Sequence, residues 1–162
     1  MGAINHDPPA LVAANLEELW RAHGPTGLRL ATVLVGPADA HDVAVSAFLR
    51  VTSFVGRSEI RNFRNYLLRA IRNEAHSLFR SRRRRQRRDV AALPERFAND
   101  PIGDVDLRTA IAGLGLRQRT VLFLAYWEDM TEAAIADTLG LSRGTVHRDL
   151  QHARNRLGKA LQ

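Results

Sequence analysis

The stretch TEAAIADTLGLSRGTVHRDLQHARNRL constrains the fold of this chain most, because it contains the start and stop signals of two helices. Thr131 and Ser142 each precede a helical pattern, and their hydroxyls can accept a hydrogen bond from a free N–H of the first turn. Gly140 suits the left-handed conformation that ends a helix. Two capped helices separated by GLS predict a helix-turn-helix, and RQRTVLFLAYW just before them predicts a buried helix.

The second of these helices has an apolar and a polar face. The residues expected to pack it down are Val146, Leu150, Ala153 and Leu157. The opposite face carries side chains that can bind base edges and phosphates. These are Arg143, His147, Arg148, Gln151, His152 and Asn155. An ordinary helical hairpin with a solvated polar face has the same pattern, so the pattern alone favours DNA binding only modestly.

Apolar spacing predicts more helices in the first half of the chain. The prolines at 8–9 suit the start of a helix that ends near Gly24, a short segment follows over 28–35, and another helix begins near Ala38. The interruption SFVGRSE, with Ser58 as a candidate N-cap, precedes the longest helix. No run of alternating apolar residues indicates a sheet, so we expect an all-α protein.

Charge is distributed unevenly along the 162 residues, which have a formal net charge of +7. The range 57–88 contains 12 arginines and two acids, and it ends in the run SRRRRQRR. The run continues the longest helix, whose polar face carries Asn65, Arg69, Arg72, His76 and Arg80. A block of like charge is often only a solvated or disordered surface, but this clustering favours a polyanion partner, either nucleic acid or an anionic membrane.

The acidic stretch DVAALPERFANDPIGDVD follows directly and divides the chain. It contains five acids and one base, and Pro94 and Pro101 disfavour a helix through it. We therefore predict two small helical domains, residues 1–88 and 107–162, joined by an acidic linker over 89–106.

Several classes of function are disfavoured by what the sequence lacks. There is no cysteine, so disulfides, thiolate nucleophiles and cysteine zinc sites are excluded. The histidines show no paired metal-ligand spacing, and no phosphate-binding glycine loop is present. No secretory signal or membrane-spanning stretch is evident. We expect a cytoplasmic protein that is not an enzyme, binds no metal or cofactor, and does not insert into a membrane.

Three stretches of the chain resemble a known family. LRQRTVLFLAYWEDMTEAAIADTLGLSRGTVHRDLQHARNRLGKAL is similar to region four of bacterial RNA polymerase sigma factors of the extracytoplasmic-function (ECF) group. ADAHDVAVSAFLRV and FRNYLLRAIRNEAHSLFRSRRRR are similar to region two of the same family. The resemblance implies a protein that binds core RNA polymerase, recognises the −10 and −35 promoter elements and melts DNA for transcription initiation, while the polymerase does the chemistry.

The resemblance assigns the DNA contacts to two helices. The recognition helix would enter the major groove of the −35 element through Arg143, Thr145, His147, Arg148, Gln151 and His152. The long basic helix would hold the −10 element, where one strand is captured after melting, through Arg61, Arg64, Asn65, Arg69, Arg72 and Asn73. Phe54 lies near the capture loop, although a core position is favoured for it.

The resemblance also implies contacts that do not read sequence. The arginine run would bind backbone phosphates through Arg80, Arg82, Arg83, Arg84 and Arg85. The acidic linker would thread through the RNA path of the polymerase. The helix that begins near Ala38 would dock on the β′ clamp helices through Asp42, Val45, Ser46 and Leu49, and the β flap is a second polymerase partner. Packing of Val45 against the first helix is an equal alternative. An anti-sigma factor is common in the family, and the sequence leaves its existence here open.

The chain departs from the usual family pattern at a few positions. They are Val45, Ser46, Thr52, Tyr66, His147 and Asp149. We expect these changes to affect polymerase affinity and promoter preference, not the fold. The alternative function is a helix-turn-helix regulator that acts without core polymerase, with the first half as a dimerisation or effector module. An arginine-rich RNA-binding protein is a third class, and membrane association ranks last.

Overall fold

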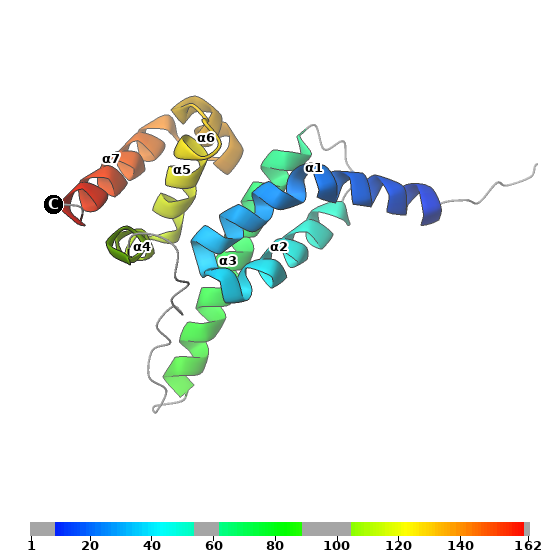
Figure 1. Ribbon diagram of the computed structural model, residues 1–162, viewed down its shortest axis with the longest axis horizontal. Helices are drawn as coiled ribbons and strands as arrows, with labels where there is room; N and C mark the ends of the chain where they lie inside the picture. The colour runs from blue at the N-terminus through cyan, green and yellow to red at the C-terminus, as the bar shows by residue number, and fades with distance from the viewer. Residues whose placement is uncertain (1–8, 54–61, 89–104, 161–162) are drawn as a thin grey trace, which may run out of the picture.

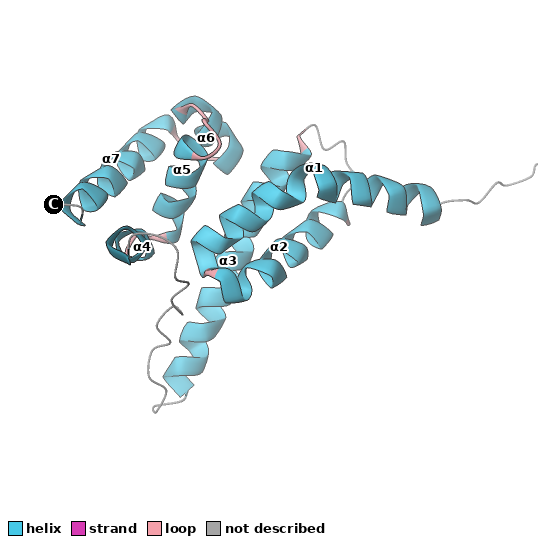
Figure 2. Cartoon of the chain, in the orientation of Figure 1, coloured by secondary structure: helices cyan, strands magenta, loops and turns pink. Residues whose placement is uncertain are grey.

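The computed structural model describes residues 9–53, 62–88 and 105–160, and these residues form helices joined by turns, with no strand among them (Figures 1 and 2). The helices are α1 (Pro9–Val35), α2 (Pro37–Thr52), α3 (Phe63–Arg88), α4 (Val105–Ala112), α5 (Leu116–Tyr126), α6 (Glu132–Leu139) and α7 (Arg143–Ala160). The all-α prediction is therefore confirmed. Residues 54–61, which include Phe54, Ser58 and Arg61, lie outside the described residues, as does most of the predicted linker.

Helices α1, α2 and α3 pack as a three-helix bundle (Figure 1). Aromatic rings join the three helices: the Trp20 and Phe48 centroids are 5.0 Å apart, and those of Phe48 and Phe63 are 5.7 Å apart. Gly27 allows α1 and α3 to approach closely, because a Cβ at this position would lie 2.9 Å from Cδ1 of Ile71. Asn62 begins α3 by accepting the N–H of Asn65 at 3.1 Å.

α1 differs from the sequence expectation because it is one continuous helix that includes Pro25. The sequence predicts a break near Gly24, since proline removes a helical hydrogen bond and crowds the preceding turn. Figure 1 shows the helix changing direction partway along its length, as expected for an internal proline. Trp20 before the proline and Leu30 after it both pack into the bundle, so packing on both sides of the proline offsets the lost bond.

The helix-turn-helix formed by α6 and α7 follows the predicted caps. Thr131 Oγ1 accepts the N–H of Ala134 at 3.2 Å, and Ser142 Oγ accepts that of Thr145 at 3.1 Å. Gly140 ends α6 with a φ of 65°, in the left-handed region. The side chains predicted to hold α7 down are buried or partly buried.

The two halves of the chain pack against each other. α5 contacts α1 and α3, and α6 contacts α3. Their apolar side chains form one continuous core, in which Leu34 and Ile71 from the first half join Phe123 and Ile135 from the second. The last turns of α3 extend beyond this body (Figure 1). Among the helices that the structure describes, none is both long enough and apolar enough to cross a membrane.

Candidate nucleic-acid interface

The outer face of α7 displays the side chains that the sequence predicts to read DNA. Arg143, His147, Arg148, Gln151, His152 and Asn155 are all exposed, and Thr145 is partly exposed. The opposite face is anchored by Val146, Leu150 and Ala153, which are at most 2% exposed. The helix is thus fixed on one side and offers hydrogen-bond donors and acceptors on the other.

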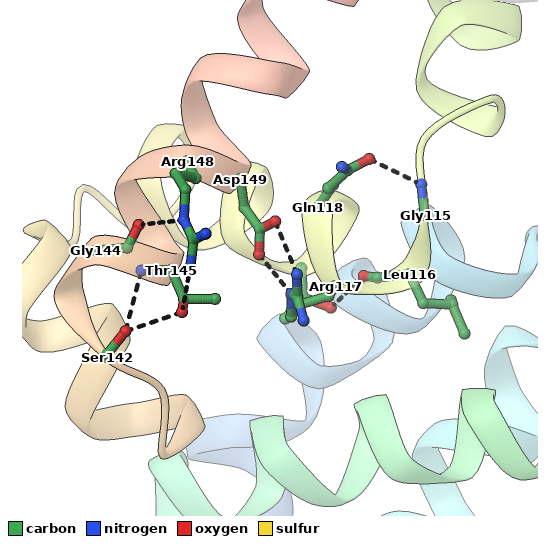
Figure 3. Close-up of polar contacts among 10 residues, drawn as sticks. Gly115, Leu116, Arg117, Gln118, Ser142, Gly144, Thr145, Arg148 and Asp149 are labelled. Atoms are coloured by element: carbon green, nitrogen blue, oxygen red, sulfur yellow. Dashed lines mark hydrogen bonds and ion pairs between the residues drawn. The ribbon is translucent and has the colours of Figure 1, made fainter.

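Arg148 is held by the first turn of its own helix (Figure 3). Its Nε donates to the Gly144 carbonyl at 3.3 Å, and its Nη2 lies 3.5 Å from the Thr145 hydroxyl. That hydroxyl in turn lies 2.9 Å from the Ser142 hydroxyl. The helix cap and the arginine therefore form one connected group, which limits the directions that the guanidinium can take. His147 is held similarly, with Nδ1 3.1 Å from Oε1 of Glu132 on α6.

Asp149 does not belong to the outer face. It leaves α7 in a different direction from Arg148 and accepts two hydrogen bonds from Arg117 on α5 (Figure 3). The hydrogen bond to Asp149 raises the pKa of Arg117. The departure from the family pattern at this position therefore builds a contact between two helices and does not change a DNA-facing side chain.

The predicted −10 residues on α3 are placed unevenly. Arg64, Asn65, Arg69 and Arg72 are partly buried, whereas Asn73 is exposed. Arg64 donates to Glu128, in the turn after α5, and Arg69 donates to backbone carbonyls at the end of α6. Arg61 lies outside the described residues. In this arrangement two of the predicted −10 arginines, Arg64 and Arg69, contact the second half of the chain.

Positive charge accumulates where α3 meets the second half. Burial lowers the pKa of Arg72, and the charges of Arg69 and Arg117 lower it further. The Nε of Arg72 is buried without a hydrogen-bond partner. Burial also lowers the pKa of His76, with a further contribution from the neighbouring charges of Arg72 and Arg80. An anion that contacted α3 would relieve part of this repulsion.

The arginine run at the end of α3 is mostly exposed. Arg80, Arg83, Arg84 and Arg85 are exposed, which suits contact with phosphates. Arg82 differs from them because its Nη2 donates to both carboxylate oxygens of Asp39, at 2.9 and 2.8 Å. This pair ties α3 to the first turn of α2.

The predicted polymerase-binding face of α2 is open. Asp42 and Ser46 are exposed, Val45 is partly buried, and Leu49 is 58% exposed. The buried side of the same helix contains Val43 and other apolar residues that pack in the bundle. Leu49 is therefore an apolar side chain on the surface with no role in the core.

Sequence reasoning missed several residues in the second half that make polar contacts. Arg119 is only 7% exposed and donates to the carbonyls of Leu114, Val33 and Leu34. Glu128 accepts a hydrogen bond from Arg64 of the first half and forms an ion pair with Arg29. Its neighbour Tyr126 accepts a 2.7 Å hydrogen bond from Arg154. The family motif covers some of these positions, but no local pattern indicates what they contact.

The described residues contain no group of three or more histidine, aspartate or glutamate side chains that could hold a metal ion.

Comparison with known families gives two matches, in the order that the sequence predicts. Residues 19–85 match the family model of sigma-70 region 2, and residues 104–157 match that of sigma-70 region 4. The second match begins just before α4, and the first ends within the arginine run.

Curated relatives agree with these matches. The chain is 32% identical over 161 residues to the ECF RNA polymerase sigma factor SigE of Mycolicibacterium smegmatis, spanning 88% of this chain and 62% of that protein. It is 30% identical over 152 residues to the RNA polymerase sigma-E factor of Streptomyces avermitilis, spanning 90% of this chain and 84% of the relative.

A solved structure has a similar fold. It is the sigma factor RpoE in complex with the anti-sigma factor NepR from Bartonella quintana, with a TM-score of 0.78 and 23% sequence identity. The match covers 91% of this chain and 96% of that chain.

Proposed function

The chain belongs to the extracytoplasmic-function group of RNA polymerase sigma factors, and we propose that it divides promoter recognition between α7 and α3 while α2 docks on core polymerase. The observation that carries this proposal is the outer face of α7. Six donor-rich or acceptor-rich side chains are exposed on a helix whose other face is anchored by the buried Val146, Leu150 and Ala153. That arrangement supports insertion of the helix into a major groove.

The −35 element is the proposed target of α7. Arg148 and Gln151 have the functional groups that pair with guanine and adenine edges, and the Arg148 guanidinium is already oriented by the helix cap. Arg143, Thr145, His147 and His152 surround them and would contribute further base or phosphate contacts.

The −10 element is the proposed target of α3, through Arg64, Asn65, Arg69, Arg72 and Asn73, with Arg61 before the helix. The exposed arginines 80 and 83–85 would contact phosphates where the helix extends beyond the bundle. Arg82 would contribute less, since Asp39 already neutralises it.

Core polymerase is the proposed partner of two surfaces. The exposed Leu49, with Asp42, Val45 and Ser46 beside it, suits the β′ clamp helices, because an exposed large apolar side chain marks a partner surface. The second half would contact the β flap, and the acidic residues of 89–106 would follow the RNA path. An anti-sigma factor is a further proposed partner, of the kind bound in the similar structure from Bartonella quintana.

We also propose that the chain has no catalytic activity of its own and works in the cytoplasm, at the nucleoid when it is bound to polymerase. The proposed domain boundaries are 1–88 and 107–162, with α4 beginning at Val105, two residues inside the proposed linker.

Run-off transcription tests the proposal. Purified core polymerase is supplied with the chain and a library of genomic fragments, and core enzyme alone is the control. A sigma factor should start transcripts at a small set of promoters only when both proteins are present, and should bind free duplex poorly. A chain that shifts duplex DNA tightly by itself and starts no transcripts with core enzyme would be a helix-turn-helix regulator instead.

A further inference from the structure

A polar contact joins the first turn of α6 to the outer face of α7. Nδ1 of His147, on α7, lies 3.1 Å from Oε1 of Glu132, on α6. Both residues come from well-anchored backbone: Glu132 directly follows the N-cap Thr131, and His147 directly follows Val146, which is fully buried. The packing of the helix-turn-helix therefore brings these two side chains together.

The contact decides which nitrogen of the imidazole carries the proton. The Glu132 carboxylate lies in the first turn of α6, where the helix dipole favours a negative charge. A carboxylate only accepts hydrogen bonds, so Nδ1 of His147 must be the donor. In a neutral imidazole one nitrogen is protonated and the other is an acceptor, and the hydrogen bond at one nitrogen sets the state of the other. Nε2 of His147 is therefore left as an acceptor.

An acceptor on the outer face of α7 is suited to only some base edges. In the major groove, N4 of cytosine and N6 of adenine are amino groups that donate, whereas O6 of guanine and O4 of thymine need a donor from the protein. The His147 side chain is 56% exposed and lies among the residues proposed to face the −35 element. With Nε2 as an acceptor, it matches an amino group and is mismatched to the guanine and thymine oxygens.

The next residue on the helix has the opposite hydrogen-bonding character. Arg148 only donates, and its guanidinium is held by the Gly144 carbonyl and the Thr145 hydroxyl (Figure 3). Neighbouring side chains on this face thus offer a donor and an acceptor. Such a pair can distinguish a base pair from its reverse, because reversal exchanges the amino and keto groups between the strands.

We propose that Glu132 is a positioning residue for promoter reading: by holding the proton of His147 on Nδ1, it makes Nε2 an acceptor for an amino group of adenine or cytosine in the −35 element. This inference rests on the proposed function, because it takes α7 as the helix that reads this element. The exposed fractions of the two side chains, 56% and 34%, mean that the pair itself adds little to stability. Its role is in specificity.

The position of the proton can be measured in the free chain without transcription. Long-range proton–nitrogen NMR correlations distinguish the two ring nitrogens, and at about pH 8 histidine is ordinarily neutral. The chain has six histidines, and the signals that are missing in His147→Gln identify the ring. We expect Nδ1 of His147 to carry the proton. A ring protonated mainly on Nε2, or on both nitrogens, would overturn the proposal.

Glu132→Gln removes the constraint with little change in shape. A glutamine side chain has both a carbonyl acceptor and an amide donor, so it can pair with either tautomer of His147. We expect the Nε2-protonated form to increase and the preference for an amino group at one −35 base pair to fall by about threefold to tenfold. The preference is measured as the ratio of transcription from promoters that differ at that base pair. An unchanged ratio would contradict the proposal.

The matched control is Glu17→Gln. It makes the same change of charge at an exposed carboxylate that pairs with Arg21 on α1, in the other half of the chain. The preference at every −35 position should stay as in the natural chain. If Glu17→Gln lowered the preference as much as Glu132→Gln, the effect would come from net charge and the proposal would be wrong.

A change of His147 to a donor tests the direction of the hydrogen bond. Lysine only donates, so His147→Lys should reverse the preference at the same base pair, from the amino group toward the guanine or thymine oxygen. Retention of the natural preference would overturn the proposal. If the natural chain starts no transcripts with core enzyme, the proposed function fails, and the NMR result still decides whether Glu132 sets the tautomer.

Discussion

Arg117 and Asp149 form a two-point ion pair between α5 and α7, with Nε to Oδ2 at 2.6 Å and Nη2 to Oδ1 at 3.1 Å. The two partners differ in their access to water: the Asp149 side chain is 7% exposed and that of Arg117 is 53% exposed. Removing Arg117 and removing Asp149 should therefore lower the free energy of unfolding by different amounts. A lone Arg117 can be hydrated, whereas a lone Asp149 is a buried charge without a partner.

Arg117→Met should lower the free energy of unfolding by about 3 kcal/mol, and Asp149→Asn by about 1 kcal/mol. Urea denaturation of the two variants and the natural chain, followed by circular dichroism, measures both values. Equal decreases in the free energy of unfolding, or a larger decrease for Asp149→Asn, would show that burial of the remaining partner does not determine the effect.

Arg148→Ala should change which −35 sequence is used. A bidentate contact to a base discriminates by about 1 to 3 kcal/mol, so the preference at one base pair should relax while preferences elsewhere stay. Transcription from promoters that vary at each −35 position gives this profile. Arg154→Ala is the control, because the Arg154 guanidinium already binds Tyr126. A uniform loss at all positions would make Arg148 a phosphate contact instead.

Replacing Arg83, Arg84 and Arg85 by glutamine should weaken promoter binding for every sequence. Three lost phosphate contacts should make the slope of log K against log salt concentration shallower by about 2 to 3. Promoter binding by the polymerase complex at several salt concentrations measures the slope. Of the matched single changes Arg82→Gln and Arg83→Gln, we expect Arg82→Gln to have the smaller effect on the slope because Asp39 neutralises Arg82.

Leu49→Asp should reduce binding to core polymerase and leave the fold intact. Because this side chain is 58% exposed, its replacement should change stability by less than about 0.5 kcal/mol. Co-elution with core enzyme and a thermal unfolding curve separate the two effects. A normal unfolding curve with unimpaired co-elution would show that α2 is not the docking helix.

The stability of the chain should depend on the protonation of His76. Burial, followed by the charges of Arg72 and Arg80, holds the pKa of this imidazole below its ordinary value of 6.5. The unfolded chain therefore binds more protons than the folded chain as pH falls below about 7, and stability decreases through that range. NMR titration of the histidine signals should give a pKa below 6.5 for His76. His76→Gln should make the dependence of stability on pH flatter, and an unchanged dependence would rule out this contribution.

The elements predicted best from the sequence are those with local causes. Thr131, Gly140 and Ser142 act within one turn of the helices that they cap, so their residue types suffice to predict the helix-turn-helix. The exposed face of α7 follows from the period of its apolar residues in the same way.

Features that depend on packing between distant residues could not be predicted, because nothing local indicates them. Pro25 predicts a break in the first helix, but packing of α1 on both sides of the proline keeps it continuous. The departure at Asp149 is expected from the family pattern to affect polymerase affinity or promoter preference, but its carboxylate binds Arg117 on another helix. Arg69 lies on a predicted DNA-binding face, and its partners lie 68 and 69 residues away in the chain.

The partners of Arg69 and Arg119 across the interface are main-chain oxygens, which every amino acid carries. Substitutions at Val33, Leu34, Asp137 or Thr138 alter side chains and leave those oxygens in place. Substitutions can therefore weaken these two contacts chiefly at Arg69 and Arg119. Under the proposed function, Arg69 is also needed to bind the −10 element. A substitution of Arg69 that weakened its contact would also weaken promoter binding. A substitution of Arg119 would weaken the contact between the halves without that loss.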